Sequence, residues 1–435
     1  MRILFITPYV PSLFRVRPYN LIKYLSQRGH RISLLSLCTS EKEEQDAELL
    51  KPYCERLQTV YVPLHRSLWN CLRGLGSRLP LQALYCYSPA MRKLLEGELN
   101  SQGSKVIGAR TGFDGRQSYD LVHIEHLRSV IFGLDVTGLP RVYDSVDCIS
   151  LLFEKVKHGP ATPGSRLKAW LDLERTKRFE GWLVGQFERV LITSEADRQA
   201  LAGLHAHFGS QGSRTKDPKG CVWKEGRISV LPNGVDLEYF KPIDQPHCPD
   251  TLLYLGRMSY HANISSVLYL VHEIMPLIWA KRPSVRLLVV GKDPPREIRA
   301  LSRPHGPLVT VTGYVPDVRP YLARATVSVN PMVYAVGIQN KVLEAMAMET
   351  PVVATPAACA SLSARDGDHL LVGHSPAQFA NQVLRLLEDQ RLQQRIGSSG
   401  RRYVEQHHDW DKMADRLEEI YREAIEGYMR HAGRE

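Results

Sequence analysis

The stretch from Gly337 to Thr355 combines flexible and charged residue types at a spacing that suits a phosphate and ribose pocket. Gly337 frees the backbone before a predicted helix whose opening turn carries Lys341 and Glu344, and an apolar β-branched segment follows. Backbone amide groups without partners at a helix start attract an anion. Here those groups belong to Ile338, Gln339 and Asn340. Lys341 adds a positive charge, whereas Glu344 would repel a phosphate and suits sugar hydroxyl groups.

A structural reading of the same residues stays open. Glu344 would then only complement the helix dipole, and Lys341 would be a solvated surface charge. Neighbouring features favour the binding site. The predicted strand Leu252–Leu255 ends in Gly256 and Arg257, and ligands bind beyond the carboxyl ends of strands in open α/β sheets.

The planar guanidinium group of an arginine can hold two diphosphate oxygens, although Arg257 could equally be an ordinary surface residue. A second predicted strand ends at Gly313-Tyr314-Val315-Pro316-Asp317, whose backbone offers an edge for a base. The two segments together predict a site for a nucleotide diphosphate.

Composition describes a globular protein of about two or three domains, with 435 residues, 43% hydrophobic and 23% charged. The net charge of +10 comes without a nucleic-acid-binding motif, so we expect no nucleic-acid partner. The eight cysteines show no metal-ligand spacing, and we expect reduced thiols. We find no signal peptide and no apolar run long enough to span a bilayer, and therefore expect a cytoplasmic protein.

The segment from Pro63 to Lys93 mixes arginines and leucines without one acidic residue. This pattern indicates an anionic membrane surface as a partner and a peripheral location at the inner face of the plasma membrane. The alternative is a pair of ordinary helices that pack on their leucines. The sequence does not decide between the two.

Strands and helices alternate twice along the chain, which predicts parallel sheets. We expect a first domain over 1–241, a second over 242–410, and a helix within 411–435 that packs back on the first domain. The predicted strands are Arg2–Ile6, Arg31–Leu37, Thr59–Val62, Leu121–Ile124, Arg141–Tyr143, Val190–Thr193, Ile228–Leu231, Leu252–Leu255, Val285–Val290, Leu308–Thr312, Thr326–Val329 and Pro351–Ala354. Predicted helices include Tyr19–Gln27, Leu167–Phe187, Ile264–Ala280, Asn340–Met348 and Met413–Met429, with an exposed loop at Leu204–Gly226.

The order and spacing of these pieces resemble the family-4 glycosyltransferases (glycosyl transferases group 1). Within that family, the chain is most similar to the sugar transferases of exopolysaccharide and exosortase (PEP-CTERM) systems. The pieces that carry the resemblance are Ile3–Thr7 with Pro8, Tyr19-Asn20-Leu21, Asp120-Leu121-Val122-His123, Ser194-Glu195-Ala196-Asp197, Leu231–Asp236, Gly256-Arg257, Gly313–Asp317 and Lys341–Ala354.

The resemblance implies an α/β fold of glycosyltransferase-B type, with two facing Rossmann-like domains and an interdomain cleft. It implies transfer of a sugar, with retention of configuration, from a nucleotide-diphosphate sugar with UDP or GDP to a glycan or lipid-linked acceptor. Arg257 and Lys341 would hold the diphosphate, Glu344 the ribose, and backbone groups near Tyr314 and Val315 the base. Residues assigned to the acceptor side are Pro8, Tyr9, Arg15, Arg17, Glu125 and His126.

His123 is a further candidate, either in contact with the donor sugar or as a core histidine. Two positions depart from the family pattern, because Val336 stands where a first glutamate is usual and Ala262 where a lysine is common. A variant pattern with glycine and lysine before the retained glutamate fits instead, and Lys341 can compensate for the missing charge.

We expect no metal and no cofactor. The one Asp-x-Asp match, at 409–411, is better suited to capping a helix. The alternative function is a non-catalytic nucleotide-sugar-binding partner subunit of a polysaccharide assembly complex, which the change at Val336 keeps open.

Overall fold

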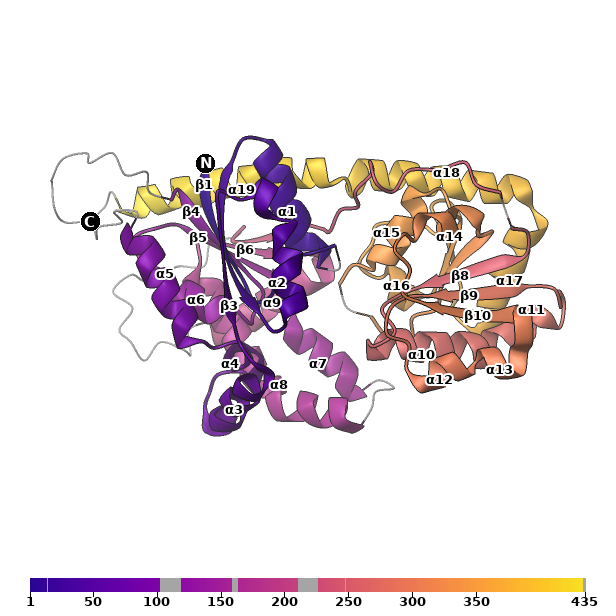
Figure 1. Cartoon of the computed structure of the whole chain (residues 1–435), viewed down its shortest axis with the longest axis horizontal. Helices are drawn as coiled ribbons and strands as arrows, with labels where there is room; N and C mark the ends of the chain where they lie inside the picture. Colours follow the sequence, from indigo (N-terminus) through magenta and orange to yellow (C-terminus); the bar gives the residue numbers. More distant parts are fainter. Residues whose placement is uncertain are drawn as a thin grey trace. The chain divides into compact units, whose positions relative to one another are not determined.

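The computed structural model describes residues 1–13, 15–101, 119–158, 163–209, 226–246, 248–335 and 337–432. The chain divides into two compact units. The first comprises Met1–Lys157, Pro163–Pro232 and Met413–Glu435, and the second comprises His158–Thr162 and Asn233–Lys412. Each unit is built around one parallel sheet (Figure 1).

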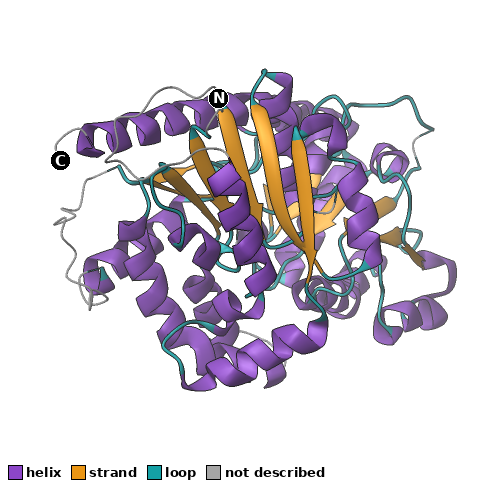
Figure 2. Ribbon diagram, turned by 60° about the vertical axis from the view of Figure 1, so that its left-hand side comes forward, coloured by secondary structure: helices purple, strands orange, loops and turns teal. Residues whose placement is uncertain are grey.

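The sheet of the first unit has seven strands in the order β3-β2-β1-β4-β5-β6-β7, and every neighbouring pair is parallel. Ile3 to Ile6, in the inner strand β1, are completely buried, as expected for a strand covered on both faces. Figure 2 shows these strands enclosed by helices. The strands are β1 (Arg2–Thr7), β2 (Arg31–Cys38), β3 (Arg56–Tyr61), β4 (Leu121–Glu125), β5 (Arg141–Val146), β6 (Arg189–Ile192) and β7 (Ile228–Val230).

Helices connect consecutive strands, because parallel neighbours need a crossover. A serine caps the amino end of some of them, as Ser194 does by accepting a hydrogen bond from the amide of Asp197. The helices of this unit are α1 (Val16–Gln27), α2 (Glu41–Glu48), α3 (Leu64–Arg73), α4 (Leu81–Tyr85), α5 (Pro89–Ser101), α6 (Val130–Leu134), α7 (Ile149–His158), α8 (Pro163–Leu183) and α9 (Glu195–Phe208), with short 3₁₀ turns η1 (Lys51–Tyr53), η2 (Gly74–Gly76) and η3 (Val184–Gln186).

The carboxyl-terminal helix α19 (Trp410–Ala432) begins in the second unit, and from Met413 onward it belongs to the first. Within the first unit, Glu418 lies 3.1 Å from His30 Nε2, and the buried Tyr421 contacts His123 of β4. The last helix thus supplies both surface and core contacts to the sheet of the first unit.

The second unit has six strands in the order β10-β9-β8-β11-β12-β13, again all parallel. The strands are β8 (Thr251–Leu255), β9 (Arg286–Val290), β10 (Val309–Gly313), β11 (Val327–Asn330), β12 (Val352–Ala354) and β13 (Leu371–Val372). The helices are α10 (His261–Tyr269), α11 (Met275–Trp279), α12 (Arg296–Ala300), α13 (Ser302–His305), α14 (Arg319–Arg324), α15 (Asn340–Ala347), α16 (Pro356–Cys359), α17 (Pro376–Glu388) and α18 (Gln390–His407), with the π turn η4 (Leu270–Ile274) and the 3₁₀ turn η5 (Gly306–Leu308).

Alternate residues of β8 enter two different cores. Leu252 and Tyr254 pack on one face of the sheet, and Leu253 and Leu255 pack on the other. A strand that is buried on both faces reads as a continuous apolar run, which is why the sequence reveals it. The two parallel sheets confirm the predicted α/β class with two Rossmann-like domains.

Some predicted boundaries differ from those observed. The units divide between Pro232 and Asn233, ahead of the predicted boundary at 241, because the segment after Pro232 bonds to α18. Arg401 of α18, for example, donates to the carbonyl of Phe240 at 2.6 Å. The predicted loop at Leu204–Gly226 is wrong for its first residues, since α9 continues to Phe208, and residues 210–225 lie outside the described part.

Two broader expectations concern cysteines and membrane spans. The cysteines in the described ranges are all free thiols. In that same part of the chain, every helix is too short or too polar to cross a bilayer.

Candidate functional site

Three glycines close the carboxyl ends of neighbouring strands in the second unit. Gly256 follows β8, Gly291 follows β9, and Gly313 ends β10. A Cβ atom on Gly291 would lie 1.7 Å from the carbonyl oxygen of Gly256, so a side chain is sterically excluded there. The amide of Gly291 donates to the carbonyl of Gly313 at 3.1 Å. The strand ends are therefore held close together, and the backbone itself forms the floor of the candidate site.

Arg257 leaves this floor and is exposed to solvent. Its Nε donates to Ser259 Oγ at 2.9 Å, which fixes part of the guanidinium. Its carbonyl oxygen accepts a 2.9 Å hydrogen bond from Nδ2 of Asn263, a buried residue in the first turn of α10. The arginine thus has a fixed backbone and a charged end that faces water.

Lys341 points inward from the first turn of α15 and is 9% exposed. Its Nζ donates to Asn263 Oδ1 at 2.7 Å and to the hydroxyl oxygen of Tyr254 at 3.0 Å. It also lies 3.3 Å from the sulfur of Met332 and 4.6 Å from the centre of the Tyr254 ring. Because Asn263 bonds both to Lys341 and to the backbone of Arg257, the structure brings these two predicted residues to the same strand end.

Burial acts on both charged residues of α15. It lowers the pKa of Lys341 to about 7, and the nearby carboxylate of Glu344 opposes this shift. Burial also raises the pKa of the partly exposed Glu344 to about 7, with Lys341 opposing. Each group is therefore only partly ionised at neutral pH, and a bound anion would favour the charged lysine.

The segment before α15 has the predicted backbone freedom. Gly337 adopts a left-handed conformation with φ of 65°. The side chain of Gln339, the N-cap residue of α15, makes no cap hydrogen bond. Ile338 packs into the core, while Asn340 Oδ1 accepts from Asn233 Nδ2 at 3.2 Å. Val336, where the family glutamate is missing, lies outside the described residues.

The segment after β10 presents one exposed and one partly buried residue. Tyr314 is 60% exposed, and Val315 packs against the core below it. Asp317 is bonded to Arg319, which lies 4.0 Å over the ring of Tyr239. The exposed Tyr314 thus lies close in the chain to the hydrogen-bonded pair of Asp317 and Arg319.

In the first unit, Arg17 and Asp144 form a buried ion pair behind the carboxyl end of the sheet. Arg17 Nε donates to Asp144 Oδ2 at 2.8 Å, and the two side chains are 4% and 0% exposed. Arg17 Nη1 also donates to the carbonyl of Leu231 at 2.9 Å. The arginine therefore ties α1, β5 and the end of β7 together.

His123 lies in the core of the first unit, where it stacks on Phe5 and is 1% exposed. Its Nδ1 is hydrogen-bonded to the Tyr421 hydroxyl at 2.8 Å, and its Nε2 lies 3.8 Å from Asp144 Oδ2. Burial lowers its pKa to about 4, so the ring is neutral at pH 7. These contacts are typical of a core histidine, which is one of the two alternatives that the sequence left open for His123.

Glu125 and His126, which follow His123 in the chain, are both partly exposed. Burial and the charge of Asp144 raise the pKa of Glu125 to about 8, and burial lowers that of His126 to about 4. His126 has a positive φ of 67°, which is uncommon outside glycine. At physiological pH, Glu125 therefore keeps a proton that it can donate.

Pro8 and Tyr9 lie at the end of β1, where Pro8 is buried. The guanidinium of Arg15 lies 4.0 Å from the centre of the Tyr9 ring and bonds to Glu43 at 2.6 Å. Arg128, which the sequence did not single out, lies 5.3 Å from the same ring. Tyr9 and the two arginines thus form a basic, aromatic patch beside Glu125.

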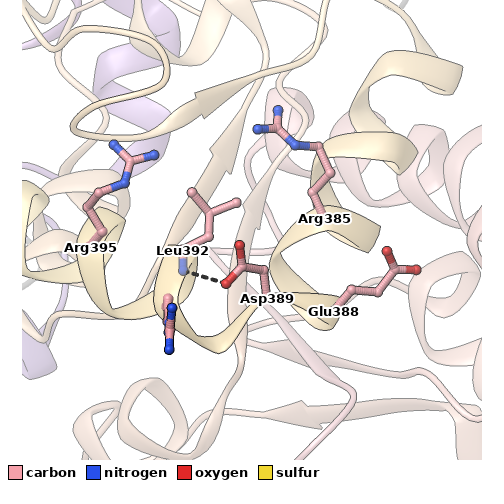
Figure 3. A pocket seen from close by; sticks show the side chains of 6 residues that line it. Arg385, Glu388, Asp389, Leu392 and Arg395 are labelled. Atoms are coloured by element: carbon pink, nitrogen blue, oxygen red, sulfur yellow. Dashed lines mark hydrogen bonds between the residues drawn. The ribbon is translucent and has the colours of Figure 1, made fainter.

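A surface depression of the second unit is lined by Arg385, Glu388, Asp389, Arg391, Leu392 and Arg395, between α17 and α18 (Figure 3). Asp389 there accepts from the amide of Leu392 at 2.9 Å and so caps α18. Within the described ranges, no group of three histidine, cysteine or acidic side chains is arranged to hold a metal ion.

Sequence reasoning missed the residues that hold Lys341. Asn263 has no local sequence signal for this role, and Tyr254 lies within the predicted strand Leu252–Leu255. A tyrosine buried in a parallel strand needs a hydrogen-bond partner for its hydroxyl, and that was the available signal.

Comparisons with known proteins show which proteins this chain resembles. Residues 249–389 match the family described as Glycosyl transferases group 1. D-inositol 3-phosphate glycosyltransferase from Streptomyces bingchenggensis is 28% identical over 273 residues, or 58% of this chain and 56% of its own length. D-inositol 3-phosphate glycosyltransferase 1 from Catenulispora acidiphila is 29% identical over 92% of this chain and 97% of its own. The chain thus spans little more than half of the Streptomyces relative.

Solved structures extend the likeness to the whole fold. Sucrose-phosphate synthase from Thermosynechococcus elongatus has a TM-score of 0.65 at 18% identity and covers 97% of this chain and 98% of its own. Anabaena Alr3699/HepE, solved with UDP and glucose, has a TM-score of 0.63 at 15% identity, with 97% and 99% covered. The predicted glycosyltransferase-B type fold is confirmed.

Proposed function

We propose that this protein transfers a sugar from a nucleotide-diphosphate sugar to a glycan or lipid-linked acceptor, with retention of configuration. The observation that carries the proposal is the shared position of two cationic side chains. Lys341 is bonded through Asn263 to the backbone of Arg257, at the carboxyl ends of parallel strands where ligands bind in such sheets.

Two cations at this place suit the chemistry of the transfer. Negative charge grows on the diphosphate when the bond to the anomeric carbon breaks, and fixed positive groups stabilise it. We assign this task to Arg257, Lys341 and the amides at the start of α15. The same groups would take the place of a metal ion.

The remaining donor contacts follow from the neighbouring residues. Glu344 is partly exposed one turn after Lys341 and suits the ribose hydroxyl groups. The backbone at Tyr314 and Val315 suits the base. UDP is the first nucleotide to test, because Alr3699/HepE was solved with UDP, and GDP is the second.

On the acceptor side, Tyr9, Arg15 and Glu125 present aromatic, basic and protonated groups near the carboxyl ends of the neighbouring strands β1 and β4. We assign His123 a positioning role behind them, because its ring is enclosed by Phe5 and Tyr421. The resemblance to transferases of exopolysaccharide systems supports a glycan or lipid-linked acceptor and action at the cytoplasmic face of a membrane.

A donor panel tests the proposal. UDP-, GDP- and ADP-sugars are incubated with and without a lipid-linked acceptor, in the presence of a chelator, and nucleotide release is measured. We expect acceptor-dependent release that the chelator does not suppress, and an anomeric configuration that NMR shows to be retained. Tight nucleotide binding without release would instead support the non-catalytic partner subunit, and release without acceptor would support hydrolysis.

A further inference from the structure

Helix α3 is inverted with respect to an ordinary surface helix. Its leucines face solvent, since Leu64 is 60% exposed and Leu68 and Leu72 are each 58% exposed. Its small polar side chains face the protein: Ser67 is buried, and Asn70 Nδ2 donates to the carbonyl of Tyr87 at 2.9 Å. A surface helix normally turns its apolar stripe to the core. The alternative of a helix that packs on its leucines therefore does not hold for α3.

A second apolar face lies on α8, about a hundred residues later in the chain. Leu167, Trp170 and Leu171 are 57%, 64% and 43% exposed, and their spacing puts them on one side of the helix. Ala169 and Leu173 are buried on the other side. The helix already packs its opposite side, with Ala169 and Leu173, against the protein, so the exposed apolar face is additional to these core contacts.

The two faces are neighbours within the first unit. The guanidinium of Arg175 in α8 donates to the carbonyl of Leu75 at 3.2 Å and to that of Leu171 at 3.1 Å. Leu75, just beyond α3, is itself 51% exposed. Figure 1 shows α3, α4 and α8 together at one end of the unit. The docking face, defined as the exposed side chains of Leu64, Leu68, Trp69, Leu72, Leu75, Leu167, Trp170 and Leu171, is one surface assembled from two segments.

Basic residues surround the docking face. The exposed basic side chains are Arg66, Arg73 and Arg78 on the α3 side and Arg166 and Lys168 on the α8 side. Arg73 lies 5.1 Å over the ring of Trp69. The nearest acids of α8 are already engaged, since Asp172 is buried against the amide of Leu81 and Glu174 lies 3.4 Å from Lys177. The partner must therefore be both apolar and negatively charged.

We propose that the docking face binds the surface of an anionic lipid bilayer. Leucines and tryptophans enter the boundary between head groups and acyl chains, while arginine and lysine reach the lipid phosphates. Large apolar side chains that are exposed together on one surface mark an interaction site. The inference extends the proposed function, because a lipid-linked acceptor is presented at such a surface, but its test does not depend on sugar transfer.

Vesicle flotation of the full chain tests the proposal. Vesicles of phosphatidylcholine with about 30% phosphatidylglycerol are compared with pure phosphatidylcholine, at low and at high salt. We expect flotation with the anionic vesicles only, weakened by salt. The double variant Trp69→Ser/Trp170→Ser should lower the partition coefficient about tenfold or more, because both side chains lose their apolar contact with lipid. Met429→Ser, which removes a 64% exposed side chain from α19, is the matched control and should float like the wild type.

Thermal unfolding and far-ultraviolet circular dichroism check that the double variant is folded. The proposal is overturned if the wild type fails to float at low salt, or if the double variant floats as well as the wild type. It is also overturned if sedimentation shows a dimer that the double variant abolishes, since a second copy would then cover the docking face. Donor turnover with a soluble acceptor, measured without vesicles, separates a failure of this inference from a failure of the proposed function.

Discussion

Lys341 Nζ donates a 2.7 Å hydrogen bond to Asn263 Oδ1, and this contact joins the first turn of α15 to the first turn of α10. The residue before Asn263 is Ala262, at the position where the pattern of the family that the chain resembles often has a lysine. We propose that Lys341 supplies from α15 the positive charge that the family pattern places on α10. This relationship gives the donor site its most specific prediction.

Lys341→Met should impair the proposed reaction while leaving the fold intact. We expect kcat/KM for the donor to fall on the order of 100-fold, because one fixed positive charge is lost near the diphosphate. Stability should stay level or rise by about 1 kcal/mol, since a buried ammonium is replaced by an apolar group of similar length. The Tyr254 hydroxyl still has Asn263 Oδ1 as an acceptor, at 3.1 Å. Steady-state kinetics and thermal unfolding measure the two effects.

A rescue and a control sharpen this test. Adding Ala262→Lys to Lys341→Met should recover part of the lost activity, because the new ammonium starts from the same helix turn as Asn263. Lys281→Met removes an exposed lysine that donates a 3.3 Å hydrogen bond to Asn381 Oδ1, and it should leave the kinetics unchanged. Wild-type turnover in Lys341→Met would remove Lys341 from the donor site.

The parts of this site that the sequence reveals are those with local signals. A glycine before a helix, a lysine and glutamate three residues apart, and an arginine after an apolar strand all lie within short windows. The inward orientation of the Lys341 side chain has no such local signal. It depends on contacts with Tyr254 and Met332, which are distant in the sequence and come together only in the folded protein. The type of residue was predictable, whereas its direction was not.

Donor binding should weaken as the pH rises above 7. The pKa of Lys341 is about 7 in the free protein, so above this pH the diphosphate must bind together with a proton. The affinity for UDP should fall by at most about tenfold per pH unit, and this slope should flatten in Lys341→Met. Calorimetry in buffers of different ionisation enthalpy measures the proton directly. Binding with no proton uptake at pH 8 would contradict the assignment.

Stability should depend on pH in two opposite directions around neutrality. From pH 7 to the ordinary lysine pKa of 10.5, the unfolded chain holds a proton that folded Lys341 has lost, so stability rises with pH. From 4.5 to 7, folded Glu344 holds a proton that the unfolded chain has lost, so this contribution falls as pH rises. Melting temperatures of the wild type and Lys341→Met, compared from pH 7 to 9, should differ most at the lower end. An equal difference across this range would refute the lowered pKa.

Arg257→Ala should reduce donor turnover on the order of 100-fold through the loss of its guanidinium. The side chain is exposed and bonded to Ser259, so the melting temperature should hardly change. Arg303→Ala, another exposed arginine of the second unit, is the matched control and should retain full activity. If Arg257→Ala and Arg303→Ala had the same rate of donor turnover, Arg257 would be an ordinary surface residue, which is the alternative that the sequence left open.

The buried pair in the first unit predicts a large effect on stability. Arg17→Met leaves Asp144 buried without its ion-pair partner and should cost about 3 to 5 kcal/mol of unfolding free energy. Arg92→Met breaks a half-exposed pair with Asp135 and should cost less than about 1 kcal/mol. Urea unfolding followed by tryptophan fluorescence compares the two. Equal costs would mean that Asp144 finds another partner when Arg17 is absent.

The family resemblance assigned Arg17 to the acceptor side, and its position in the chain gives no sign of burial. The partners that enclose it come from β5 and from the end of β7. His123 shows the same limit, since its neighbour Tyr421 lies almost three hundred residues away. Local patterns identify strand ends, while the choice between a core and a site residue depends on contacts that only the folded chain makes.

Gly256→Ala should weaken donor binding without removing any charge. A Cβ atom at this position would lie 2.9 Å from Nδ2 of Asn263, so the amide must move, and Lys341 would lose its 2.7 Å hydrogen bond. We expect the Kd for UDP to rise about tenfold, with a smaller effect than Lys341→Met because the ammonium is displaced and not lost. Gly203→Ala in α9, where a Cβ atom meets nothing within 4 Å, is the control. Unchanged binding in Gly256→Ala, with a normal melting temperature, would show that the position of Asn263 does not govern the donor site.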